Sequence, residues 1–346
     1  MKHQTTRYGE IPFYKIGTFG NTADAFISKK LFLEYKTKYS FPKKGDILIS
    51  ASGTIGRAVI YDGKPAYFQD SNIVWIDNDE TLVKNDFLFY AYSNVKWNTE
   101  HTTILRLYND NFRNTLIPLP PLNEQIAIAD ILSALDRYLY ALDALILKKE
   151  GVKKALSFEL LSQRKRLKGF NQAWQRVRLG DIANYLTSNL SAEQITQQGK
   201  IKVYDVNNFI GYTDTTFISD KPYISIVKDG SVGRVRILPP KTNILSTMGA
   251  LIANHRTTTE FLFYLLSNFD FKNFTSGSII PHIYFKDYKE KTIFLPPLNE
   301  QSAIADILSD LDHEIISLKN KKRQFENIKK ALNHDLMSAK IRVLKK

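Results

Sequence analysis

Two stretches of the chain repeat apolar residues at steps of three and four positions. The first runs from residue 128 to residue 160 and the second from residue 304 to residue 336. Steps that average 3.5 are typical of a helix whose apolar seam packs against another helix. Each stretch follows two prolines and opens with Asn and Glu, which favour the start of a helix. We therefore predict two helices of about 40 residues, each roughly 60 Å long.

The remaining parts of the chain carry shorter apolar runs. Residues 46–50, 58–61 and 73–76 are β-branched or aromatic runs separated by Gly and Asp. Such runs predict short strands joined by tight turns. Residues 87–93 and 261–267 match one another as Phe-Leu-Phe-Tyr segments and predict buried helices. Each of these parts therefore reads as a compact α+β domain.

The chain contains an internal duplication. Residues 119–125 and 295–301 both read Leu-Pro-Pro-Leu-Asn-Glu-Gln, and the shift of 176 positions holds without a gap into both long helices. Such identity indicates a tandem repeat. We expect an α+β fold with pseudo-two-fold character, in which the two long helices form an antiparallel coiled coil. The expected boundaries are residues 1–117 and 170–293 for the variable domains, and residues 118–169 and 294–346 for the helices.

Charge and composition narrow the class of protein. The chain has 346 residues, a net charge of +13 and no cysteine, so disulfides and thiolate metal sites are excluded. The basic excess gathers in residues 148–168 and 319–346, which suits a polyanionic partner. Cations at helix C-termini also stabilise the helix dipole, which is the simpler alternative. No apolar run is long enough to span a membrane and no signal core follows the N-terminus, so we expect a cytoplasmic protein.

A glycine-rich turn occurs in both copies. Residues 53–57 read Gly-Thr-Ile-Gly-Arg, and residues 230–234 read Gly-Ser-Val-Gly-Arg. Such a turn lets the backbone approach phosphates or bases while its arginine reaches an acceptor. A plain hairpin with an exposed arginine is the alternative. The candidate DNA-contacting residues here are Ser52, Thr54, Arg57, Lys228, Ser231 and Arg234.

A second paired segment precedes each proline pair. Residues 102–108 read Thr-Thr-Ile-Leu-Arg-Leu-Tyr, and residues 278–284 read Ser-Ile-Ile-Pro-His-Ile-Tyr. Hydroxyl, cationic and aromatic side chains suit groove or phosphate contacts. A connecting strand with its tyrosine in the core is the alternative. The candidates are Thr102, Thr103, Arg106, Tyr108, Ser276, Ser278, His282 and Tyr284.

The sequence carries no pattern of a catalytic centre. It has no phosphate-binding loop, no zinc-binding helix motif, no nucleophile elbow and no amino-methyltransferase motif, and its six histidines lack ligand spacing. The duplicated carboxylates Asp136 and Asp312 fall on the long helices, where we expect them to face solvent or a partner. We therefore predict no catalytic residue and no metal site.

The repeated Leu-Pro-Pro-Leu-Asn-Glu-Gln segment and its helix ending in Lys-Lys-Ala-Leu resemble the DNA-specificity subunit of type I restriction-modification enzymes. The resemblance covers essentially the whole chain. It implies two target recognition domains that read the halves of a bipartite, asymmetric double-stranded DNA site. It also implies a non-catalytic subunit without cofactors that docks two methyltransferase subunits and, through them, restriction subunits with translocase and nuclease activity. S-adenosylmethionine, ATP and Mg are then expected on those partners.

The constant segments suggest a docking surface, because sequence held the same in both copies suits two identical partners. The candidate partner-binding residues are Asn123, Glu124, Gln125, Asn299, Glu300 and Gln301.

The first copy departs from the pattern at its start. The second copy opens with a family-like strand near Trp174, whereas the first starts at a later point, with residues 9–14 resembling residues 199–204. The missing strand is either borrowed from residues 341–344 or dispensable. If neither holds, the first domain is weakened in DNA binding.

Three alternatives stay open. The chain could target a related system whose partner fuses methyltransferase and nuclease, serve as an assembly scaffold without DNA binding, or be a nuclease with an unrecognised site. A scaffold predicts salt-insensitive affinity, and a nuclease predicts metal-dependent cutting by the chain alone.

Overall fold

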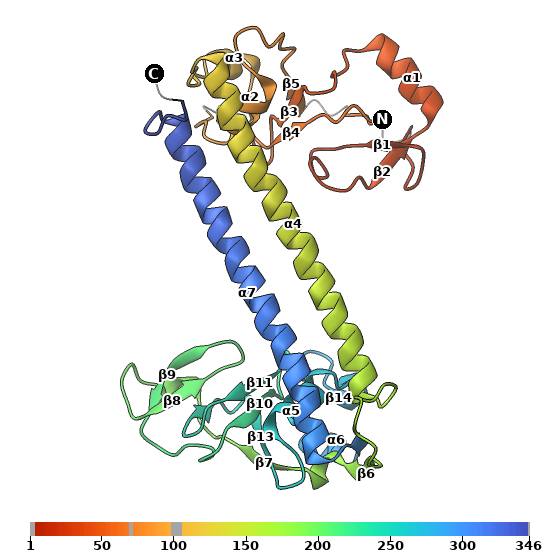
Figure 1. The fold of residues 1–346 in the computed structure, drawn as a ribbon, viewed down its shortest axis with the longest axis vertical. Coiled ribbons are helices and arrows are strands. Elements are labelled where there is room, and N and C mark those ends of the chain that lie inside the picture. The colour runs from red at the N-terminus through yellow and green to blue at the C-terminus, as the bar shows by residue number, and fades with distance from the viewer. Residues whose placement is uncertain (1–3, 69–71, 98–105, 345–346) are drawn as a thin grey trace. The chain divides into compact units, whose positions relative to one another are not determined.

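The computed structural model describes residues 4–68, 72–97 and 106–344. The chain divides into two compact units: unit 1 comprises residues 1–143 and 320–346, and unit 2 comprises residues 144–319. Each unit holds one α+β domain and half of each long helix (Figure 1). Residues at matching positions of the two units are called counterparts.

The two long helices are α4 (Leu122–Leu161) and α7 (Leu298–Met337), each of 40 residues as predicted. Both begin one residue before the asparagine expected at the N-cap. In α4 the carbonyl of Pro121 already accepts hydrogen bonds from the N–H groups of Glu124 (2.9 Å) and Gln125 (3.0 Å). Asn123 therefore lies in the first turn, where its Oδ1 accepts from the N–H of Glu124 at 3.0 Å.

Within each unit the helix halves pack antiparallel. In unit 2, Lys149 pairs with Glu314 at 2.7 Å and Lys153 with Asp312 at 2.5 Å, so one helix ascends as the other descends. In unit 1 the ring of Tyr138 packs on that of Phe325, with centroids 4.6 Å apart. The 3.5-residue seam of the sequence is thus occupied by apolar contacts flanked by ion pairs.

The α+β domain of unit 1 consists of short strands and helices. Its elements are β1 (Ile11–Phe13), β2 (Ala25–Ile27), α1 (Lys29–Lys38), β3 (Ile47–Ser50), β4 (Ala58–Ile60), β5 (Ile73–Trp75), α2 (Asn85–Tyr92) and α3 (Asn109–Arg113). β3 is the centre of an antiparallel β4-β3-β5 sheet, and β1 pairs with β2. The three sheet strands and α2 confirm the strands and the buried helix predicted from the sequence.

The α+β domain of unit 2 is larger. Its elements are β6 (Gln175–Arg178), η2 (Leu179–Asp181), β7 (Ala183–Thr187), η3 (Ala192–Gln194), β8 (Ile201–Tyr204), β9 (Phe209–Thr213), β10 (Tyr223–Val227), β11 (Val235–Leu238), β12 (Asn243–Ile244), β13 (Met248–Ala253), α5 (Thr259–Ser267), η4 (Lys272–Phe274), β14 (Thr275–Ser276), β15 (His282–Ile283), α6 (Phe285–Tyr288) and β16 (Thr292–Leu295). The main sheet has the order β11-β10-β13-β7. β10 therefore corresponds to β3, and α5 to α2.

Each domain is anchored to the helices by an apolar cluster of the same design. In unit 1, Phe87 of α2 packs with Leu132 of α4 and Leu336 of α7. In unit 2, Phe261 of α5 packs with Leu308 of α7 and Leu160 of α4. Leu132 and Leu308 are fully buried, so truncating either to alanine costs about 2 to 5 kcal/mol.

The opening strand differs between the units. In unit 2, β6 pairs antiparallel with β16. Residues 341–344 form no strand in the structure, so the idea that this tail replaces the missing strand of unit 1 is wrong. The tail is used differently: Arg342 bonds the carboxylate of Glu124, as its counterpart Arg166 bonds Glu300. The ion pair between Arg342 and Glu124 holds the tail against the start of α4.

Candidate nucleic-acid interface

The glycine-rich turn of unit 1 joins β3 to β4. Gly53 and Gly56 have φ values of +65° and +81°, in the left-handed region that favours glycine. The hydroxyl of Ser50 donates to the carbonyl of Thr54 and accepts from the N–H of Arg57 at 3.0 Å. The exposed guanidinium of Arg57 donates to the carbonyl of Phe19 at 3.0 Å. These hydrogen bonds fix the shape of the turn, and the bond to Phe19 holds its arginine at the surface.

The turn of unit 2 joins β10 to β11 in the same way. Gly230 and Gly233 have φ values of +84° and +80°. The exposed guanidinium of Arg234 donates to Oδ1 of Asn207 at 2.9 Å, and Arg236 donates to the carbonyl of Asn207 at 3.0 Å. Asn207 and Arg236 were not among the sequence candidates, because nothing in their spacing links them to the turn.

An aromatic ring lies under each turn and explains its second glycine. A Cβ at Gly56 would lie 2.2 Å from Nε1 of Trp97, and a Cβ at Gly233 would lie 2.6 Å from the ring of Phe271. Each ring would have to shift to admit such an atom, and the ring of Phe271 is buried in the core. A side chain at either glycine is therefore excluded both by backbone conformation and by space.

The structure brings the turn and the second paired segment together in both units. The N–H of Leu107 donates to the carbonyl of Ala51 at 2.8 Å, and the N–H of Ile283 donates to the carbonyl of Lys228 at 2.9 Å. Isolated bridges pair Ser52 with Arg106 and Asp229 with His282. Two candidate segments about 50 residues apart thus form one surface in each unit.

The surface of unit 2 carries a polar cluster. Nδ1 of His282 lies 2.7 Å from Oδ1 of Asp229, and Nζ of Lys228 lies 3.1 Å from the other carboxylate oxygen. Partial burial raises the pKa of Asp229, but hydrogen bonds from His282 and Lys228 outweigh it, so the net pKa is lowered. Tyr284 is half-exposed beside His282, with Lys286 over its ring at 5.5 Å. Asp229 and Lys286 were missed from the sequence, where neither stands out.

In unit 1 the same position carries different chemistry. The Arg106 guanidinium lies 5.8 Å from the centroid of the Tyr108 ring, and Tyr108 is exposed. Ser52, the counterpart of Asp229, is buried. Thr102 and Thr103 fall outside the described residues.

The remaining hydroxyl candidates lie at the surface. Thr54 and Ser231 are exposed on the two turns, and Ser276 and Ser278 are exposed around the β14–β15 hairpin. Gly277 bends this hairpin with a φ of +90°. These four side chains are accessible to a ligand, whereas Ser52 is not.

The Asn-Glu-Gln segments play a structural part that the sequence did not reveal. Gln301 is fully buried; its Nε2 donates to the carbonyls of Arg256 (2.9 Å) and Pro296 (2.8 Å), and its Oε1 accepts from the N–H of Thr258 (3.0 Å). Its counterpart Gln125 makes the matching bonds to the carbonyls of Leu82 and Pro120 and to the N–H of Lys84. Each glutamine ties the start of a long helix to the start of α2 or α5.

The glutamates of these segments are also engaged within the chain. The carboxylate of Glu300 accepts from Arg166 at 2.6 Å and from the indole N–H of Trp174 at 3.0 Å. The hydrogen bonds and charge of Arg342 lower the pKa of Glu124. Asn123 and Asn299 alone are exposed among the six candidates for partner docking.

Two duplicated carboxylates have a role other than the expected one. Asp312 accepts from the hydroxyl of Tyr264 at 2.9 Å and from Lys153 at 2.5 Å. Its counterpart Asp136 accepts from Tyr90 at 2.8 Å and from Lys329. The expectation that these carboxylates face solvent or a partner is therefore wrong. Each joins a domain helix to both long helices, a contact between segments distant in sequence.

The residues that the structure describes contain no group of three or more His, Cys, Asp or Glu that could hold a metal ion. Among the same residues, no helix is long and apolar enough to cross a membrane.

The chain thus carries two copies of one design, in which an α+β domain with an Arg-bearing turn packs on the long helices. Residues 1–149 and 171–327 match the family described as "Type I restriction modification DNA specificity domain". The chain belongs to this family, whose members are non-catalytic specificity subunits that recognise DNA targets within type I restriction-modification complexes and carry no cofactor of their own.

Individual proteins that are similar to the chain are also specificity subunits of type I systems. A type I restriction enzyme specificity subunit of Haemophilus influenzae is 65% identical over 133 residues, which are 38% of this chain and about a third (34%) of that protein. The MjaX specificity subunit of Methanocaldococcus jannaschii is 29% identical over 336 residues, covering 86% of this chain and 79% of that protein. The S subunit of a type I system from M. genitalium has the same fold, with a TM-score of 0.64 at 20% identity over 97% of this chain and 91% of that chain.

Proposed function

We propose that each α+β domain reads one half of a bipartite, asymmetric DNA target through its glycine-rich turn and the segment bridged to it. The observation that carries this proposal is the matching bond from Leu107 to Ala51 and from Ile283 to Lys228. The backbone frame is the same in both units. The side chains on it differ, with Arg106 in one unit and His282 in the other, as two different half-sites require.

The chemistry of the frame suits a DNA groove. Arg57 and Arg234 are exposed, and each is held at the surface by one hydrogen bond, which leaves other guanidinium N–H groups to bind guanine edges or phosphates. Lys228 and Lys286 add positive charge beside the Tyr284 ring. Cations of this kind favour phosphate contacts that fix the register on the duplex.

We further propose that two methyltransferase subunits dock on the constant parts of the chain and recruit the restriction subunits. The duplicated segments offer two equal surfaces, and Asn123 and Asn299 are the exposed members of the proposed contact. Since Glu124, Gln125, Glu300 and Gln301 are buried, they support this surface by holding the helix starts in place. S-adenosylmethionine, ATP and Mg belong to the partner subunits in this scheme.

The test is DNA binding by the chain assembled with its methyltransferase subunits. Arg57→Ala and Arg234→Ala should each weaken binding to one half-site by about 1 to 3 kcal/mol, a loss of roughly 5- to 150-fold. Arg176→Ala is the matched control, because Arg176 is exposed in unit 2 but lies on β6, away from the turn. Methylation mapping identifies the half-site that each variant affects.

Three results would distinguish between base contacts, phosphate contacts and no contact with DNA. An equal loss on every DNA sequence would make both arginines phosphate contacts, and no loss would remove them from the interface. An affinity that does not fall as salt is raised would contradict DNA binding itself, because phosphate contacts release counterions.

A further inference from the structure

Unit 1 contains a cavity that the proposed DNA surface does not use. Its volume is about 160 Å³. Six of its apolar lining residues are Ile76, Leu88, Tyr92, Trp97, Phe112 and Ile117. A dry apolar cavity of about 150 Å³ is known to bind a small apolar molecule, so this one has room for an aliphatic side chain. The hydroxyl of Tyr92 is buried and finds no hydrogen-bond partner among the described residues, and burial raises its pKa well above the ordinary value of 10.0.

Unit 2 shows what fills the same place there. The counterparts of the six lining residues all belong to its apolar core: Leu251, Leu262, Leu266, Phe271, Tyr288 and Ile293. That core also contains Leu179 and Ile182, both fully buried. These two side chains come from the segment of residues 174–187, which has no counterpart among the described residues of unit 1. The cavity of unit 1 therefore corresponds to the volume that this segment occupies in unit 2.

The backbone beside the cavity is suited to accept a strand. In unit 2 the N–H of Leu179 donates to the carbonyl of Lys291 at 3.0 Å. Hydrogen-bonded and non-hydrogen-bonded pairs alternate along antiparallel strands, so Ile293 and Val177 form a hydrogen-bonded pair, and the N–H of Phe294 points away from β6. The counterpart of Phe294 is Pro118, whose missing N–H would not face the added strand. Leu116 and Leu119, which flank Ile117 and Pro118, are exposed.

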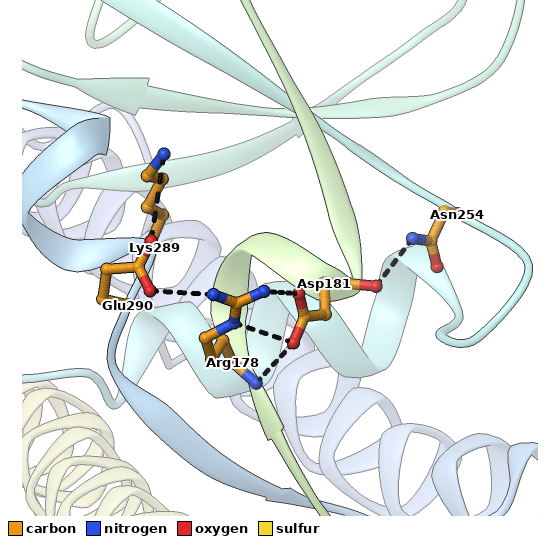
Figure 2. Close-up of polar contacts among 5 residues, drawn as sticks. All are labelled: Arg178, Asp181, Asn254, Lys289 and Glu290. Atoms are coloured by element: carbon orange, nitrogen blue, oxygen red, sulfur yellow. Dashed lines mark hydrogen bonds and ion pairs between the residues drawn. The ribbon is translucent and has the colours of Figure 1, made fainter.

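Polar contacts hold the segment in unit 2. In unit 2, Trp174 anchors the segment by donating to Glu300, and the Arg178–Asp181 ion pair (2.9 Å) lies against Glu290 (Figure 2). In unit 1, Glu124 is held by Arg342 in the same way that Glu300 is held by Arg166. The carboxylate of Glu124 is buried and also accepts the N–H of Val343, so the indole contact of unit 2 does not carry over to unit 1.

We propose that unit 1 binds an extended peptide segment with the pattern aliphatic-x-Leu-Gly-Asp-Ile, as seen at residues 177–182. The segment adds as a β-strand along residues 115–119 and inserts aliphatic side chains into the cavity. Main-chain bonds supply affinity and the alternating side chains supply specificity, as in other cases of strand addition. This inference concerns a peptide ligand and does not depend on DNA recognition.

The test uses the full chain and a fluorescent peptide with the sequence of residues 173–187. Fluorescence anisotropy should show saturable binding, and a peptide with the changes V177D and L179D should bind at least tenfold more weakly. Ile76→Asp in the chain should reduce affinity at least tenfold; because Ile76 is 41% exposed, unit 1 can fold with this change. Ile328→Asp is the matched control, since Ile328 is 50% exposed on α7, outside the cavity, and should leave affinity unchanged.

A gain-of-binding variant sharpens the test. Asn254 donates to the backbone carbonyl of Asp181 at 3.0 Å. Its counterpart is Asp79 in the strand register that matches Ile76 with Leu251, and Oδ1 of each accepts an N–H two residues on, from Arg256 and from Thr81. A carboxylate cannot donate, so Asp79→Asn should tighten peptide binding about 2- to 10-fold.

Hydrogen exchange locates the bound peptide. Bound peptide should slow amide exchange within residues 115–119. The proposal is overturned if neither the parent chain nor Asp79→Asn binds saturably, if Ile76→Asp or the substituted peptide binds as tightly as the parent, or if exchange at residues 115–119 does not slow.

Discussion

Replacing Gln301 by leucine should destabilise unit 2 far more than its position near a helix start suggests. The side chain is fully buried and bonds the carbonyls of Arg256 and Pro296, the N–H of Thr258 and the hydroxyl of Thr257. Leucine has a similar size but satisfies none of these groups. Each buried group left unpaired costs about 1 to 3 kcal/mol. Allowing for partial relaxation, the local opening free energy of α5 should fall by about 2 to 5 kcal/mol.

Hydrogen exchange measured by mass spectrometry is the appropriate assay, because it reports the two units separately. A fall of this size speeds exchange of the α5 amides by roughly 30-fold to several thousandfold. The α2 amides, which depend on Gln125, should not change. Ser302→Ala is the control, since Ser302 is exposed in the same helical turn and should shift stability by no more than about 0.5 kcal/mol. A change below about 1 kcal/mol for Gln301→Leu would refute the idea that the glutamine holds the domain to the helix.

Two further predictions concern the unit 2 turn and its polar cluster. Gly233→Ala should destabilise unit 2 more than Gly230→Ala in urea unfolding, because both have positive φ but only Gly233 has a ring, that of Phe271, in the way; equal losses would contradict this packing. The pKa of Asp229 is lowered in the folded state, so its contribution to stability is complete above the ordinary value of 3.8 and is lost as the pH falls through the lower folded pKa. Asp229→Asn should therefore flatten the fall in urea midpoint below about pH 4, and an unchanged profile would argue against the contact with His282.

The sequence by itself determined the elements whose signal is local. The 3.5-residue seam predicted both 40-residue helices, since helix periodicity needs no knowledge of the partner helix. The Gly-rich turn between two β-branched runs predicted β3 and β4, because glycine readily adopts the positive φ that Gly53 and Gly56 have. The duplication, read from identity alone, predicted two units of the same design.

Only the tertiary structure decided which distant residues meet. Asp136 and Asp312 looked like solvated helix carboxylates, yet each accepts from a tyrosine of its domain and a lysine of the other long helix. The Asn-Glu-Gln segments looked like a docking surface, yet burial assigns Gln301 to the interior. Such contacts depend on burial and on pairs more than 40 residues apart, and no short-range pattern records either. The cavity of unit 1 is likewise a tertiary feature, because its lining residues come from segments that are distant in sequence. Their counterparts in unit 2 belong to a filled core.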